Sequence, residues 1–166
     1  NFGDGVVVSN MSYISHSWMA AGNYTVRLTG YNDSFPSGVS ATVIINVVNQ
    51  PVFYVNPLST SPLYPYSSWG TAAKTIQEAI DAGSLPGRLV LVTNGVYNAG
   101  GRAVYGLMTN RIVLTQGVIV KSVNGPVVTF IVGAEAPGGG NGDGAIRCVY
   151  VGTNALLSGF TLTNGH

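Results

Sequence analysis

Residues 6–48 show the alternation of hydrophobic and polar positions that is typical of β-strands with one buried face. The alternation is clearest in residues 24–29 and is less regular in residues 41–47. Residues 31–38, which lie between these stretches, are dense in turn-forming residue types. The pattern therefore predicts two antiparallel strands joined by a short loop.

The hydrophobic spacing becomes helical in residues 69–83, where apolar side chains recur at i, i+3 and i+4. The residues of this apolar face are Ala72, Ala73, Ile76, Ala79 and Ile80. Ser68 and Thr71 are candidate N-caps, and Gly83 is placed to follow the last turn. Because much of the face is alanine, we expect this helix to lie close against another surface.

Residues 51–68, before the helix, hold four of the chain's eight prolines together with several serines and tyrosines. Proline cannot donate to a strand ladder and restricts the residue before it. We therefore predict an extended linker over residues 51–68, with one domain in residues 1–50 and another in residues 69–166.

Short hydrophobic runs separated by Gly or Asn-Gly fill the sequence after Gly87. Such runs suit either β-hairpins or the coils of a solenoid. Two features favour the solenoid. Several runs are apolar throughout, as expected for strands with both faces covered, and residues 118–125 resemble residues 156–165.

Composition narrows the class of protein. Only 8% of the residues are charged, 46% are hydrophobic, 23 are glycine and one is cysteine. A surface that is polar without charge, with many turns, is typical of extracellular all-β proteins. The net charge of +1 includes no Lys/Arg run, so we expect no nucleic-acid partner. The longest apolar runs have the length of strands, so we expect no membrane insertion.

Several motifs resemble known families. Residues 2–5 (Phe-Gly-Asp-Gly), 15–18 (Ser-His-Ser-Trp) and 22–29 (Gly-Asn-Tyr-Thr-Val-Arg-Leu-Thr) resemble the second half of a PKD domain, an immunoglobulin-like β-sandwich. Residues 66–80, 91–97 and 157–162 resemble the N-terminal portion of pectate-lyase-like right-handed parallel β-helix proteins of the bacterial surface or secreted type.

These resemblances imply an all-β chain in which a partial immunoglobulin-like β-sandwich is joined to the helix-capped start of a right-handed parallel β-helix. They also imply that the first sandwich strands are lacking and that further coils follow His166. Members of the second family include polysaccharide lyases, glycoside hydrolases and adhesins. The resemblance to the family therefore does not settle the function.

The six carboxylates do not form the pair that sugar cleavage needs, so no catalytic residue is assigned. The glycine-rich stretch 136–144 gives one candidate site, in which Glu135, Asn141 and Asp143 would be oxygen ligands for Ca²⁺ or contacts for a sugar. The alternative, which we favour, is a flexible excursion between coils with no metal and no cofactor.

Aromatic residues near the linker give a second candidate surface. Tyr64, Tyr66 and Trp69 are placed either to stack on sugar rings or to bury the domain junction, and the second role is favoured.

The sequence thus predicts a non-catalytic structural or adhesive segment of a large extracellular or cell-surface bacterial protein, which binds cell-surface or matrix polysaccharide or assembles with copies of itself. The alternative is the N-terminal part of a polysaccharide lyase or glycoside hydrolase whose active site lies in later coils.

Overall fold

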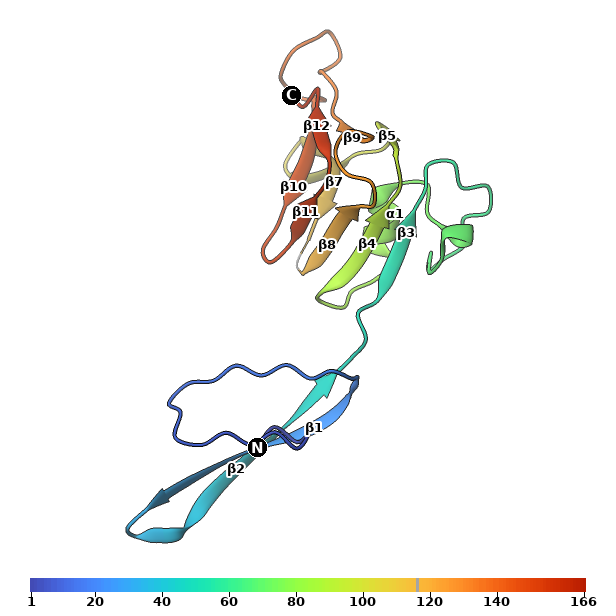
Figure 1. Cartoon of the computed structure of the whole chain (residues 1–166). Coiled ribbons are helices and arrows are strands. Elements are labelled where there is room, and N and C mark those ends of the chain that lie inside the picture. The colour runs from blue at the N-terminus through green and yellow to red at the C-terminus, as the bar shows by residue number, and fades with distance from the viewer. Residues whose placement is uncertain (116) are drawn as a thin grey trace. The chain divides into compact units, whose positions relative to one another are not determined.

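The computed structural model describes residues 1–115 and 117–166 and shows an all-β protein (Figure 1). Within these residues, the helical elements are a 3₁₀ turn, η1 (Trp69–Thr71), and one short α-helix, α1 (Ile76–Asp81). None of the described helices is long and apolar enough to cross a membrane. The chain forms two compact units, Asn1–Asn49 and Gln50–His166, and each is described here by itself.

The first unit is built on an antiparallel hairpin of β1 (Gly22–Asn32) and β2 (Phe35–Val47), as the alternation predicted. The strands are longer than expected, because they continue into the stretch predicted as a loop. Asn32 pairs with Phe35, and the Asn32 side-chain oxygen accepts a hydrogen bond from the Phe35 N–H at 2.8 Å. The turn between the strands is therefore reduced to Asp33 and Ser34.

The register of the hairpin separates an apolar face from a polar one. Val26 lies opposite Val43 and Tyr24 opposite Ile45, whereas neighbouring pairs such as Asn23 with Asn46 are polar. Residues in register point to the same side of a sheet. No described residue of this unit is buried, and Leu28, on the apolar face, is 75% exposed. Trp18 stacks on Tyr24 at one end of the apolar face, and the rest of that face is largely exposed.

The second unit consists of three sheets in which strands from successive passes of the chain lie side by side. The sheet orders are β11-β8-β4-β3, β12-β9-β5 and β10-β7-β6. All of these pairs are parallel except β6 with β7. The strands are β3 (Val52–Val55), β4 (Arg88–Val92), β5 (Gly95–Tyr97), β6 (Arg102–Tyr105), β7 (Met108–Leu114), β8 (Val118–Ser122), β9 (Thr129–Val132), β10 (Ile146–Val151), β11 (Leu156–Ser158) and β12 (Thr161–Thr163).

The chain returns repeatedly to the same sheet. Arg88 pairs with Val118, which is 30 residues later, and Ile119 pairs with Leu156, which is 37 residues later. Parallel neighbours need such crossovers and cannot be joined by a tight hairpin turn. The hairpin interpretation is therefore wrong for these strands. We call this arrangement of the second unit the stack.

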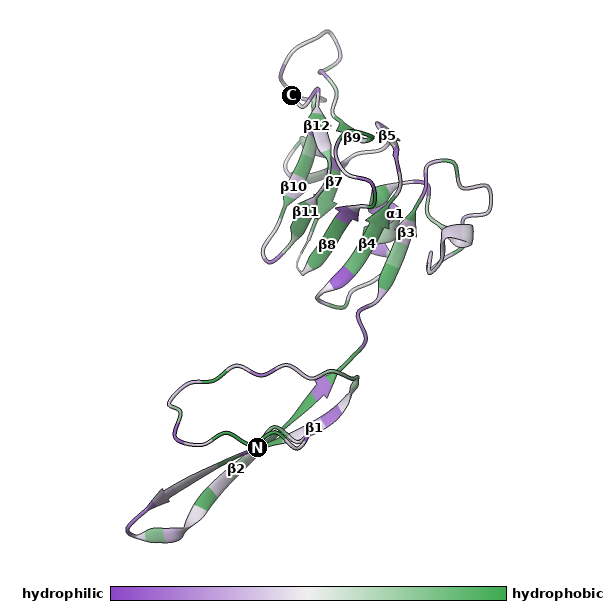
Figure 2. Cartoon of the chain, in the orientation of Figure 1, coloured by the Kyte–Doolittle hydropathy of each residue, from purple (hydrophilic) through white to green (hydrophobic). Residues whose placement is uncertain are grey.

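The core of the stack lies between the three sheets. Residues at matching register positions are enclosed in each sheet, and hydrophobic residues run through β4, β7 and β8 (Figure 2). The fully enclosed hydrophobic strand residues are Val55, Val90, Val92, Leu114, Val118, Val120 and Ile131. Helix α1 adds Ile76, Ala79 and Ile80 to the same cluster.

The helix is much shorter than the range 69–83 that the periodicity predicted. Ala72 is extended (φ −56°, ψ 143°), and Ala73 forms a parallel bridge with Val55 at the edge of β3. Neither Ser68 nor Thr71 caps α1. Thr75 does so, because its side chain accepts a hydrogen bond from the Glu78 N–H while the Glu78 carboxylate accepts from the Thr75 N–H.

The stretch predicted as a linker contains a strand of the stack. Val52–Val55, between Pro51 and Pro57, carries no proline and pairs in parallel with β4 as strand β3. On its other edge, the Tyr54 N–H donates to Tyr66 O and the Ala73 N–H donates to Tyr54 O, both at 2.9 Å. Residues 66–73 therefore cover the outer edge of β3.

Candidate functional site

One concave site in the stack is a groove of about 600 Å³ between α1 and the connection from β5 to β6. Its wall on the helix side includes Lys74, Glu78 and Asp81, and its other wall includes the segment 96–102. Arg111 and Ile112 of β7 also line it. Arg111 is the deepest charge there, because it is only 6% exposed, whereas Lys74 and Asp81 are exposed.

Two of the five charged groups that line this groove form an ion pair. Arg102 donates to both Asp81 carboxylate oxygens, at 2.8 and 2.5 Å, and this bond raises the pKa of Arg102. Glu78 is exposed, and its carboxylate is held in the capping box. Arg111 differs from these groups, because its two hydrogen-bond acceptors are the carbonyls of Gly100 and Val132.

Tyr97 lies beside the groove with its hydroxyl turned into the protein. The hydroxyl donates to Thr93 O at 3.0 Å, and burial raises the pKa of Tyr97 to about 12. A phenol with such a pKa stays protonated at neutral pH and is a poor base. It therefore acts as a structural hydrogen-bond donor and gives the groove no acid–base chemistry.

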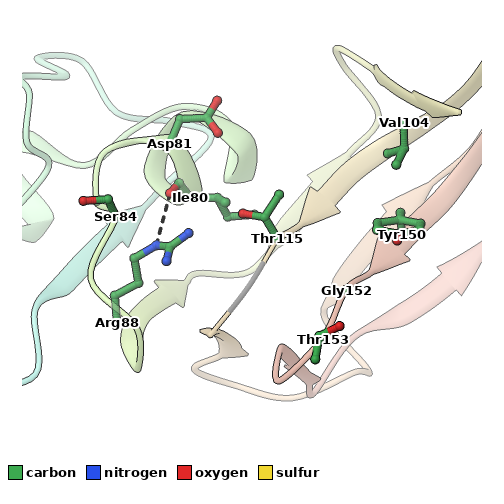
Figure 3. Close-up of a pocket in the computed structure, with 10 residues that line it drawn as sticks. Ile80, Asp81, Ser84, Arg88, Val104, Thr115, Tyr150, Gly152 and Thr153 are labelled. Atoms are coloured by element: carbon green, nitrogen blue, oxygen red, sulfur yellow. Dashed lines mark hydrogen bonds between the residues drawn. The ribbon is translucent and has the colours of Figure 1, made fainter.

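A second hollow, of about 620 Å³, lies between the end of α1 and β10 (Figure 3). Asp81, Ser84 and Arg88 line one side, and Tyr150 and Thr153 line the other. The Arg88 Nε donates to Ile80 O at 3.4 Å, and burial lowers the pKa of Arg88. This hollow combines hydroxyls with one tyrosine but brings no two carboxylates together.

The predicted cation or sugar ligands fall in the loop that follows β9. Asn141 and Asp143 line a hollow of about 370 Å³ with Arg147 and His166, but Glu135 does not line it. Glu135 instead lies 3.8 Å from the His166 ring. The structure therefore brings Asn141 and Asp143 to one place and leaves Glu135 out of it. No group of three acidic, histidine or cysteine side chains that could hold a metal occurs in the described residues.

The predicted aromatic surface is divided into two ring pairs. Tyr64 meets Tyr66 edge to face at 6.1 Å, and Trp69 meets Tyr54 in the same way at 4.6 Å. Tyr66 packs against the core, whereas Tyr64 is 68% exposed. Tyr64 and Trp69 therefore remain available at the surface, where Tyr66 supports Tyr64 and Tyr54 supports Trp69.

Comparison with protein-family models, with curated proteins and with solved structures gave no match for this chain.

The groove was not predicted from the sequence because its residues come from four separate segments. Arg111 directly precedes a hydrophobic run and Arg102 follows a glycine pair, and neither has a motif around it. The one signal present was Thr75-Ile76-Gln77-Glu78, a capping-box sequence that places the start of α1 beside Lys74.

Proposed function

We propose that this chain is a non-catalytic structural segment of an extracellular or cell-surface protein. In this proposal the stack is the helix-capped start of a right-handed parallel β-helix, and the first unit is part of an immunoglobulin-like β-sandwich. The observation that carries it is the difference between the two ends of the stack, which favours a module that continues by strand pairing in one direction.

One end of the stack has covered strand edges. Besides the bonds to β3, the amide of the Gln77 side chain in α1 makes two hydrogen bonds to the backbone of Val113 in β7. Its oxygen accepts from the Val113 N–H at 2.8 Å, and its nitrogen donates to Val113 O at 3.4 Å. A side-chain amide thus takes the place of a neighbouring strand at this position. Such covering prevents edge-to-edge association, which unprotected strand edges favour.

The other end is formed by β10, β11 and β12, the last strands in their sheets. Leu162 of β12 continues the inward column of Ile131, yet it is 50% exposed whereas Ile131 is fully enclosed. Val151 of β10, in register with the enclosed Leu114, is also exposed. We call β10, β11 and β12 the open end. It presents strand edges together with half-covered apolar side chains.

The proposal commits to association at the open end with a second copy of this chain. We expect its average mass by light scattering to rise with concentration. The double variant V151K/L162K places two charges in the open end and should stay monomeric. Val123→Lys is the matched control. Val123 lies outside the open end, and it is 50% exposed, as Leu162 is. A wild-type chain that stays monomeric throughout the concentration series would refute self-association.

The non-catalytic part of the proposal has its own test. Incubation with pectate or alginate should release no unsaturated or reducing ends. Their release, with loss of this activity in a heat-denatured sample, would support the alternative of a lyase or hydrolase segment.

The adhesive part rests on Tyr64 and Trp69, whose exposed rings are held by their partners. Stacking on sugar faces needs such fixed aromatic surfaces. Retardation of the chain in a gel containing polysaccharide should be lost in Tyr64→Ala. Tyr13→Ala, which removes an exposed tyrosine of the first unit, should leave it unchanged.

A further inference from the structure

Arg111 is a buried cation held only by neutral groups. Its Nε donates to Val132 O at 2.7 Å, at the end of β9, and its Nη1 donates to Gly100 O in the β5–β6 connection. In the part of the chain that the structure describes, no carboxylate lies within ion-pair distance of it. Burying a guanidinium without a counter-charge is costly, because carbonyls compensate for its lost hydration only in part.

The neighbouring side chains do not supply a counter-charge to Arg111. Arg102, in the same groove, has the Asp81 carboxylate as a bidentate partner. The titratable group that interacts electrostatically with Arg111 is the thiol of Cys148. Cys148 lies beside Arg111 in the parallel pairing of β7 and β10. Since Arg102 already neutralises Asp81 and Glu78 is held at the N-terminus of α1, neither carboxylate is free to balance Arg111.

The Arg111 guanidinium has one unused nitrogen, Nη2, and Arg111 lines the groove. Nη2 of Arg111 makes no hydrogen bond with a described residue. Among those residues, the only fully enclosed side-chain nitrogen or oxygen without a partner is Ser59 Oγ. Nη2 therefore retains access to solvent, and the opening is the groove that Arg111 lines.

The walls around this opening suit a small anionic group. Ala99, Gly100 and Gly101 line the groove on one side and leave room close to the backbone. Lys74 lies on the other side and makes no ion pair with a described residue, and with it the three cations of the groove outnumber its two carboxylates, Glu78 and Asp81. Val96 and Ile76 give the groove an apolar part that would contact the body of a ligand.

We propose that the groove binds a carboxylate-bearing ligand, with the carboxylate on Nη2 of Arg111 and Lys74 adding attraction. The planar guanidinium matches the two oxygens of a carboxylate, and such charge-assisted bonds are among the strongest hydrogen bonds. The site is independent of the open end and of self-association. Its ligand would carry the carboxylate on a sugar acid or at the C-terminus of a peptide, and the two sources are distinguished below.

The test is a titration of the full ¹⁵N-labelled chain followed by ¹H–¹⁵N NMR. Glucuronate and N-acetylglycine are the two carboxylate probes, and glucose and N-acetylglycinamide are their uncharged counterparts. We expect saturable shifts at the Gly100 and Gly101 amides and at the Arg111 Nε signal with at least one carboxylate probe. A response to glucuronate alone would assign a sugar acid, and a response to N-acetylglycine alone would assign a peptide terminus.

Variants then test the role of each charge. Arg111→Gln should weaken binding at least about 10-fold. Lys74→Glu, at an exposed position, should weaken it by a smaller factor, whereas Arg147→Gln, an exposed arginine of β10, should leave it unchanged. If Arg111→Gln does not fold, Lys74→Glu and the wild-type Arg111 Nε signal decide. Equal shifts with charged and uncharged probes, or an Arg111 Nε signal that does not move, would overturn the proposal.

Discussion

The sharpest quantitative test of the stack compares two side chains of one inward column. Ile131 of β9 lies in register with Leu162 of β12 and with Tyr97 of β5. Ile131 is fully enclosed, whereas Leu162 is 50% exposed. Replacing either residue by alanine removes the same number of carbon atoms, so the two variants differ in burial and not in chemistry.

The expected sizes follow from that burial. Removing three buried carbon atoms costs about 2.4 kcal/mol in transfer free energy, at about 0.8 kcal/mol for each. The cavity left in an enclosed site raises the cost of Ile131→Ala to about 3–5 kcal/mol. Leu162→Ala should cost about 1 kcal/mol, because half of its surface already meets water and no closed cavity forms.

Urea unfolding followed by far-UV circular dichroism measures both free energies of unfolding. The slope of free energy against urea should be unchanged, so the difference appears in the midpoint. If Leu162→Ala destabilised the protein as much as Ile131→Ala, the open end would be as closed as the centre. The stack would then not have one open and one covered end.

Three further predictions concern single contacts. Gln77→Ala should lower the free energy of unfolding by about 1–3 kcal/mol and speed amide hydrogen exchange at Val113, because the Val113 N–H loses its acceptor. Unchanged exchange at Val113 would contradict the covering role of Gln77. Gly133→Ala should cost more than about 2 kcal/mol in urea unfolding, because its Cβ would lie 2.3 and 2.4 Å from two backbone oxygens, whereas the same change at the open position Gly30 should cost less. Desolvation acts to raise the pKa of Asp4, but hydrogen bonds from His16 and the backbone hold the pKa below its ordinary 3.8. The ionised Asp4 therefore stabilises the fold above pH 3.8, and this stabilisation is lost as the pH falls through the lowered pKa. Tryptophan fluorescence should show this loss as an acid step that Asp4→Asn removes.

The class of fold followed from the sequence because several strands have a hydrophobic run of their own. Val90 to Val92 and Val118 to Val120 were recognisable as buried strands, and the alternation in residues 24–29 gave the hairpin. These are local signals. The parallel order of the sheets was favoured only by runs that were apolar throughout, since Asn-Gly turns suit hairpins equally well.

The helix and the linker were misplaced for a physical reason. Ala72 and Ala73 continue the apolar spacing of Ile76, but they are buried at the outer edge of β3 and not on a helix. Periodicity reports burial on one side and does not distinguish a helix from a strand edge over a few residues. The capping-box residues Thr75 and Glu78 mark the true start, and here the local hydrogen bonds outweigh the pattern.

The candidate site could not be predicted, because its properties arise from pairings across the sequence. Arg111 donates a hydrogen bond to Val132, which is 21 residues later. Asp81, a carboxylate of the same groove, is already paired with Arg102. Composition shows that charged residues are few. It could not show which of the few charges would be buried without a partner.

The covered end of the stack and the groove are built by the same short helix. Gln77 turns toward β7 and bonds its backbone, while Lys74 and Asp81 line the groove. Covering the edge of β7 therefore fixes the position of the groove wall that faces Arg111. A change that detaches Gln77 from β7 should alter carboxylate binding as well as stability, whereas a change at the open end should alter association alone. This separation is what makes the two proposals independently testable in one chain.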